Sequence, residues 1–123
     1  MLPTELLQRV LDCVPDATII VDESGAIVIA NRPTCDLLGY APSELQGQSV
    51  ELLVPERFRL AHIGRRILFT DDRRDRTMET GHGLLVRCKD GSELRVAISL
   101  GSVPHGLETL TVAAIRVDAR HTS

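Results

Sequence analysis

The sequence predicts an α+β domain in which helices cover one face of a five-stranded antiparallel sheet. Three observations predict this fold class. The 123 residues are enough for one compact domain that buries about two thirds of its unfolded surface. Two strand-like runs lie near the N-terminus, and three more follow the middle of the chain. The segment between these groups has helical spacing. A chain order of strands, helices and strands again favours one sheet whose face the helices cover.

The chain begins with a segment, residues 1–14, that predicts an amphipathic helix. Thr4 is a suitable cap, and Pro15 ends the helical pattern. Apolar residues at i, i+3, i+4 and i+7 form one stripe, which consists of Leu7, Val10, Leu11 and Val14. The stripe must be buried, and spacing alone does not decide between its own domain and a second copy. We take these four residues as the candidate dimer interface.

The next segment predicts a β-hairpin followed by short helices. Residues 17–21 and 26–30 are rich in β-branched residues, and Gly25 in the loop between them is available for positive φ. Asn31 is a suitable N-cap for a short helix that Gly39 would end. Two further helical turns are predicted at residues 42–46 and 51–54.

The second half of the chain changes from helical to strand periodicity. Residues 56–70 predict a longer helix, whose apolar face contains Leu60, Ile63, Gly64, Ile67 and Leu68. Alternating residues then predict strands at 84–89 and 93–100, joined by a turn at Asp90-Gly91. A turn at Pro104-His105-Gly106 precedes the last strand, residues 107–117. Residues 119–123 are a polar tail or the start of a linker, so we place the domain itself at residues 15–118.

Composition and charge exclude several classes of function. The formal net charge is −3 with both signs mixed along the chain, so a basic surface for nucleic acid is not expected. No apolar run approaches the roughly 18 residues of a membrane helix. Three widely spaced cysteines fit neither a disulfide framework nor a zinc site, and the four histidines lack metal-ligand spacing. We expect a cytoplasmic domain without metal, in which Cys35 and Cys88 are small buried residues.

Four stretches resemble the PAS domain family of sensory modules, in the family's order and over nearly the whole chain. They are VLDCVPDATIIVDESGAIVIAN (10–31), CDLLGYAPSELQGQSVELLVPE (35–56), RFRLAH (57–62) and RCKDGSELRVAISL (87–100) with the closing VAAIRV (112–117). Among relatives, the chain is similar to the amino-terminal PAS modules of multidomain actinobacterial phosphatases and anti-sigma regulators. The family's Asp-Ile-Thr signature follows the last strand's arginine directly, whereas here Arg116 is followed by Val117 and then Asp118.

The resemblance implies the strand order 2-1-5-4-3 and a pocket between the sheet and the long helix. It also implies a homodimeric bacterial sensor that regulates an attached signalling output domain. The pattern of inward positions gives the candidate pocket lining, in which His82 is the polar group: Leu53, Leu68, Met78, His82, Leu84, Val96, Ile98 and Leu100. These residues either fill a core or line a cavity. With only three aromatic residues in the chain, a cavity would suit a small apolar or amphipathic molecule, such as an acyl chain, better than a planar cofactor.

The sequence gives little evidence for catalysis or for the cofactors known in PAS domains. Nucleophilic catalysis needs a hydroxyl or thiol beside a base, and no such motif appears, so we expect no enzyme. The family's cysteinyl-flavin photochemistry is excluded because residues 47–54 contain no cysteine. The resemblance places His62 at the haem-ligand position of the family's oxygen sensors. On an ideal helix, however, His62 points roughly 160 to 200° from the apolar stripe, toward Arg65 and Arg66.

Three hypotheses follow, and the first is favoured. It is a non-enzymatic sensory and dimerisation module that binds a small apolar or amphipathic ligand, with no certain cofactor. The second is a ligand-free docking and dimerisation module, and the third is a haem-based gas or redox sensor that uses His62.

The haem hypothesis predicts an absorbance signature that the favoured hypothesis does not. We expect the purified protein to show no Soret band, alone or with added haemin, because His62 faces charged rather than apolar neighbours on the predicted helix. A Soret band that His62→Ala abolishes would instead identify a haem sensor. The absorbance spectra of the wild type and the variant, recorded at equal protein concentration, decide the point.

Overall fold

The computed structural model describes residues 4–55 and 77–117, and of residues 4, 77–83 and 105 only the backbone. The expected long helix at 56–70 and the polar tail lie outside the described residues. Nine elements follow one another along the described chain: α1 (Thr4–Asp12), β1 (Ala17–Val21), β2 (Ile27–Ala30), α2 (Arg32–Leu38), α3 (Pro42–Leu45), the 3₁₀ helix η1 (Val50–Leu53), β3 (Thr77–Arg87), β4 (Glu93–His105) and β5 (Glu108–Val117).

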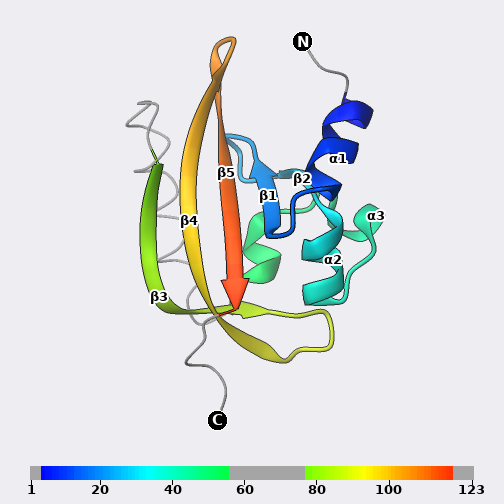
Figure 1. Ribbon diagram of the computed structural model, residues 1–123, viewed down its shortest axis with the longest axis vertical. Helices are drawn as coiled ribbons and strands as arrows, with labels where there is room; N and C mark the ends of the chain where they lie inside the picture. Colours follow the sequence, from blue (N-terminus) through cyan, green and yellow to red (C-terminus); the bar gives the residue numbers. More distant parts are fainter. Residues whose placement is uncertain (1–3, 56–76, 118–123) are drawn as a thin grey trace.

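The strands form one antiparallel sheet in the order β2-β1-β5-β4-β3, as the resemblance implied (Figure 1). The first strand along the chain therefore lies between β2 and the last strand. Ile19 is opposite Ala30 on one side and Ala113 on the other. This register connects the N-terminal hairpin to the C-terminal strands through β1.

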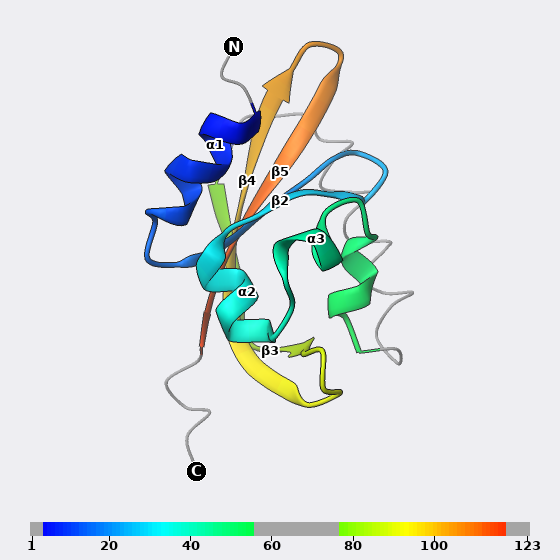
Figure 2. The same cartoon turned by 90° about the vertical axis from the view of Figure 1, so that its right-hand side faces the viewer.

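The helices lie on both sides of the sheet (Figure 2). With the strands seen almost edge-on, α3 and η1 are on one side and α1 is on the other. The side of α3 and η1 encloses the main apolar cluster, which includes Ile19, Leu38 and Leu45. On the other face, Ile20 is opposite Ile29, and both side chains are buried outside that cluster. Strand β1 is consequently buried on both faces.

The short elements form where the sequence predicted them, for local reasons. The Asn31 side chain accepts a hydrogen bond from the Thr34 amide and caps α2. Gly39 ends this helix with φ of 86°, a left-handed conformation that glycine adopts without a Cβ clash. The N-terminal hairpin is confirmed as well, with Gly25 at φ of 91° in its turn.

Three boundaries differ from the sequence-based expectation. Helix α1 ends at Asp12, so Val14 lies in the following turn rather than in a helix that reaches residue 14. Strand β3 begins at Thr77 instead of residue 84, because its pairing with β4 shifts around Gly81 and this shift hides the alternation. Strand β4 continues through Pro104 to His105. In the described residues, the pairing of β4 with β3 extends only to the Thr77–Gly101 pair. Pro104 lies beyond this pair, so its missing N–H removes no hydrogen bond between the two strands.

The outer edge of β2 is paired with the segment between α3 and η1. The Ile27 amide donates to the Gln48 carbonyl, and the Gly47 amide donates to the Ile27 carbonyl, both at 2.8 Å. The Val50 amide donates to the Gly25 carbonyl at 2.8 Å. The start of this edge, at Gly25 and Ile27, therefore has backbone groups satisfied by the same chain.

The Asn31 side chain is fully buried and joins four parts of the chain. Its Oδ1 accepts hydrogen bonds from the amides of Thr18 at 2.8 Å and Thr34 at 3.2 Å, and it lies 2.7 Å from the Thr34 hydroxyl. Its Nδ2 donates to the carbonyls of Leu11 at 2.8 Å and Asp16 at 3.0 Å. The end of α1, the loop before β1, the start of β1 and the start of α2 are thus held by one amide group.

Two more hydrogen bonds attach α1 to the same region. The Arg32 amide donates to Oδ1 of Asp12 at 2.7 Å, and Nε2 of Gln8 donates to the Ala30 carbonyl at 3.1 Å. Helix α1 is consequently fixed to the sheet edge by polar contacts from its last two turns.

Replacing Asn31 with alanine should lower the free energy of unfolding by about 3 kcal/mol, because buried donors and acceptors lose their partners. Urea denaturation followed by circular dichroism measures the loss. Gln46→Ala, which removes an exposed amide from the end of α3, is the matched control and should change stability by less than about 0.5 kcal/mol. Equal effects of the two substitutions would contradict a structural role for the buried amide.

Candidate functional site

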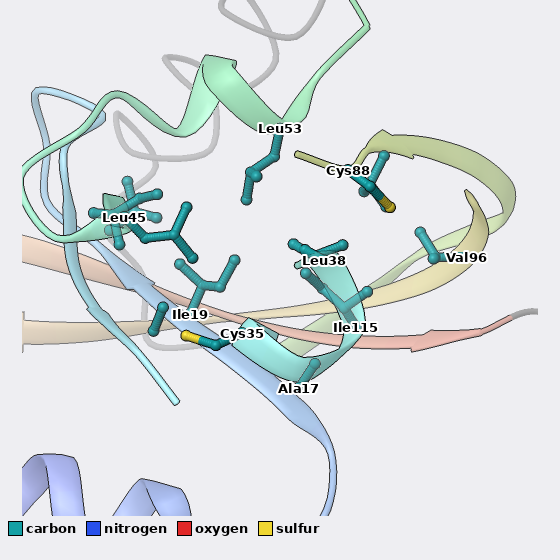
Figure 3. Packing of buried hydrophobic residues seen from close by; sticks show 13 residues of the cluster. Ala17, Ile19, Cys35, Leu38, Leu45, Leu53, Cys88, Val96 and Ile115 are labelled. Carbon is teal, nitrogen blue, oxygen red and sulfur yellow. The ribbon is translucent and has the colours of Figure 1, made fainter. Parts of the chain in front are cut away.

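The candidate site is an aliphatic wall on the inner face of the sheet. Leu53 extends from η1 toward the apolar cluster, where Figure 3 shows it facing Leu38 and Ile19. Val96 on β4 is 0% exposed and is opposite Leu84 on β3. The Ser49 hydroxyl caps this 3₁₀ turn by accepting a hydrogen bond from the Glu51 amide. Leu53, the last residue of the turn, is buried.

Burial along β4 changes from one inward residue to the next. Alternation puts Val96, Ile98 and Leu100 on one face, and the register places Ile98 opposite Ile115 and Leu100 opposite Ala113. Val96 is completely buried, whereas Ile98 and Leu100 are only half-buried. The middle of the longest strand therefore keeps accessible aliphatic surface on its inner face.

The structure brings part of the predicted pocket lining together. Leu53 and Val96 belong to the buried cluster, and Leu84 and Ile98 pack against it. Leu100 continues the same face of β4. Met78 and His82 are on β3, but their side chains are outside the described residues, as are Leu68 and His62.

The sequence analysis missed several residues that share this face. Ser102 follows Leu100 by two positions on β4 and is 4% exposed. The turn predicted at Pro104 ended the expected strand too early for Ser102 to be included. Leu38 and Leu45, from α2 and α3, form the opposite side of the cluster and were assigned only to helical turns. Their burial depends on contacts between distant segments, which local spacing does not contain.

Two of the cysteines are buried in the apolar core. Cys35 and Cys88 are each 7% exposed within the apolar cluster, which confirms the expectation that they act as small core residues. Burial raises the pKa of the Cys35 thiol, and the carboxylates of Asp36 and Asp12 raise it further. The thiol consequently stays protonated and is a poor nucleophile near neutral pH.

The described residues offer neither a metal centre nor a membrane span. In residues 4–55 and 77–117, no cluster of three or more histidine, cysteine, aspartate or glutamate side chains is placed to hold a metal ion. Over the same ranges, no helix is long and apolar enough to cross a membrane.

The residues of the candidate dimer stripe differ in burial. Leu7, Leu11 and Val14 are half-buried against their own domain, whereas Val10 is 48% exposed. Leu6, which the predicted stripe did not include, is 43% exposed on the same helix. The apolar arc of α1 therefore has one side packed and one side open.

A sheet in this strand order, with helices enclosing an aliphatic inner face, defines a class of small α+β domains. The family described as the PAS fold matches residues 5–115, so the chain belongs to the PAS family. The resemblance noted in the sequence is thereby confirmed, and the chain is a PAS sensory domain.

Individual relatives agree with this assignment. Sensor protein FixL of Bradyrhizobium diazoefficiens is 25% identical over 115 residues, which are 94% of this chain and 23% of FixL. The chain thus spans about a quarter of that relative. A PAS domain from Colwellia psychrerythraea superposes with a TM-score of 0.75 at 21% identity, covering 94% of this chain and 98% of that one. The PAS domain of an HTR-like protein from Haloarcula marismortui gives a TM-score of 0.73 at 23% identity, covering 94% and 91%.

Proposed function

We propose that this PAS domain is a non-enzymatic sensor that binds a small apolar or amphipathic ligand on the inner face of its sheet. Occupancy of that face regulates an attached signalling output domain. The observation that carries the proposal is the half-burial of Ile98 and Leu100 beside the completely buried Val96. Inward aliphatic residues in the middle of a sheet are normally closed off by packing, and these retain surface that a ligand can cover.

The chemistry of the wall indicates the class of ligand. Its described members are aliphatic, and the next polar residue on the same face of β4 is Ser102, two positions beyond Leu100. Burial of apolar surface contributes about 25 cal/mol per Å² and needs no directional partner. A flexible hydrocarbon such as an acyl chain can follow such a wall, whereas a planar cofactor would need aromatic or polar contacts.

Two groups with shifted pKa values, Asp22 and Cys35, are explained by their structural surroundings. Burial raises the pKa of Asp22, but hydrogen bonds from the Ser24 hydroxyl and from the amides of Ala26, Ser24 and Gly25 outweigh it and lower the pKa. That carboxylate therefore stays ionised and closes the β1–β2 turn. The Cys35 thiol stays protonated for the opposite reason, its burial. Neither group has the pKa of a general base near neutral pH.

Regulation by a ligand requires that it bind two packings of the domain with different affinity. The wall combines residues from η1, β3 and β4, namely Leu53, Leu84 and Ile98. A ligand in contact with all three residues favours the packing in which the distance between η1 and strands β3 and β4 matches the size of the ligand. Ligand binding is then converted into a change in how the helical segments pack on the sheet.

Filling the wall with a larger side chain should displace the ligand. We expect Ile98→Trp to reduce the copurified or added ligand to roughly a tenth of the wild-type amount, because the indole occupies the accessible surface. Native mass spectrometry after gentle purification, and again after addition of a medium-chain fatty acid, measures occupancy. Arg95→Trp puts the same side chain on the exposed opposite face of β4 and should leave occupancy unchanged.

Two results would contradict the sensor proposal. One is a wild-type protein that carries and accepts no apolar molecule from several expression hosts, which would favour the ligand-free docking module. The other is equal loss of ligand in both tryptophan variants. Circular dichroism melting of each variant shows whether the fold is intact when occupancy is compared.

We also propose that the domain forms a homodimer through the outer face of the sheet and α1. Leu6 and Val10 are exposed on α1, and Val103 on β4 is 45% exposed. Alternation places Val103 on the face opposite the inner wall, which is also the side of α1 (Figure 2). Exposed apolar residues on a helix and on the same side of the sheet can be covered together by a second copy of the chain.

A charge placed in this surface should weaken the dimer. We expect Val10→Glu to raise the dimer dissociation constant at least about tenfold, because a carboxylate at a two-fold contact meets its own copy. Sedimentation equilibrium measures the constant. Gln46→Glu adds the same charge at the exposed C-cap of α3 and should leave the dissociation constant unchanged. Deleting residues 1–14 is a less specific test, because it also removes the Leu11 carbonyl that the Asn31 amide contacts. A monomeric wild type would contradict the proposal.

A further inference from the structure

An open groove lies where the C-terminal end of α2 meets the turn between β3 and β4. Figures 1 and 2 both show these two segments side by side at one end of the sheet. The apolar part of the groove is formed by Leu37, Leu38, Cys88 and Leu94. Leu38 and Cys88 are buried, and Leu37 and Leu94 are half-buried against the core cluster. The groove therefore has an apolar floor that is continuous with the core.

The walls of the groove are fixed by backbone hydrogen bonds. The Lys89 amide donates to the Leu38 carbonyl at 2.9 Å, which joins the strand turn to the end of the helix. Within the turn, the Cys88 amide donates to the Ser92 carbonyl at 2.8 Å. The left-handed Gly39 leaves the helix end open toward the turn, where a Cβ on this glycine would lie 3.7 Å from the Lys89 Cβ. A partner meets a preformed surface and has little ordering cost to overcome on this side.

The rim of the groove is acidic. Asp36 on α2 and Asp90 in the strand turn are exposed carboxylates on either side of the floor. The cation at the rim, Lys89, is 2.6 Å from Glu44, so its charge is matched by that carboxylate. Hydrogen bonds from the hydroxyl and amide of Ser92 lower the pKa of Asp90, which keeps it ionised. The carbonyl end of α2 adds a partial negative charge on the same side.

We propose that this groove docks a cationic amphipathic segment of a partner protein. An apolar side chain of the segment lies between Leu37 and Leu94, and its Lys or Arg side chains meet Asp36 and Asp90. The juxtaposition of an apolar floor and two carboxylates that no cation of the rim neutralises is the basis of this assignment. The site is separate from the proposed ligand wall and from the proposed dimer face, and it does not depend on either.

A labelled model peptide tests the groove. The probe is a fluorescein-labelled helical peptide of about 16 residues, with leucines at i, i+3, i+4 and i+7 spacing and arginines between them. Fluorescence anisotropy gives its affinity for the whole chain, and ¹⁵N chemical-shift mapping gives its position. We expect shifts concentrated at residues 36–39 and 88–94, and binding that weakens with added salt.

Matched variants separate the groove from general attraction to an acidic protein. The double variant D36N/D90N removes both rim charges, and the asparagine at residue 90 keeps the acceptor that closes the turn. We expect it to weaken peptide binding about fivefold. The control E5Q/E108Q makes the same change of net charge at exposed residues of α1 and β5, and it should stay within about twofold of the wild type.

Several outcomes would overturn the proposal. They are the absence of binding, equal weakening by the two double variants, and shifts concentrated at Leu6, Val10 and Val103 instead of the groove. Equal affinity for a peptide with glutamates in place of the arginines would also overturn it. Leu37→Ala provides an independent check, because it removes floor contact without changing charge and should weaken binding about threefold.

Discussion

The buried amide of Asn31 is the interaction on which the arrangement of this domain depends. It contacts the end of α1, the loop before β1, the start of β1 and the first turn of α2. An amide has both donors and acceptors, and here it donates to the backbone carbonyls of Leu11 and Asp16 and accepts from the backbone amides of Thr18 and Thr34. The position of β1 beside α2 is therefore set by hydrogen bonding as well as by packing.

The placement of β1 has consequences for both faces of the sheet. Ile19 enters the inner cluster while Ile20 is buried on the side of α1, so one short strand serves two apolar layers. β5 lies next to β1 and is opposite Ile98 and Leu100 on its other side. The inner wall, the outer face and the N-terminal helix are consequently connected through a single pair of central strands.

Local chemistry made much of the fold predictable, and non-local contacts explain the rest. Gly25, Asn31 and Gly39 act through their own backbone neighbourhood, so their turn and cap roles were readable from the sequence. The start of β3 could not be predicted from the sequence, because the pairing with β4 is irregular at Gly81 and the alternation of side chains is lost there. The candidate site was predicted in part, since Val96 and Ile98 follow a strand period. The acidic groove could not be predicted, because it requires Asp36 and Asp90, 54 positions apart in the sequence, to line the same groove.

The pairing of the β2 edge with residues 47–50 affects how this domain behaves at high concentration. Open sheet edges recruit strands from other molecules, and such recruitment leads to aggregation. Here that edge is occupied by a segment which then turns into the 3₁₀ helix η1 instead of continuing as a strand. Lateral growth of the sheet is therefore hindered where β2 begins. Self-association at this part of the edge has to use side chains rather than backbone amides.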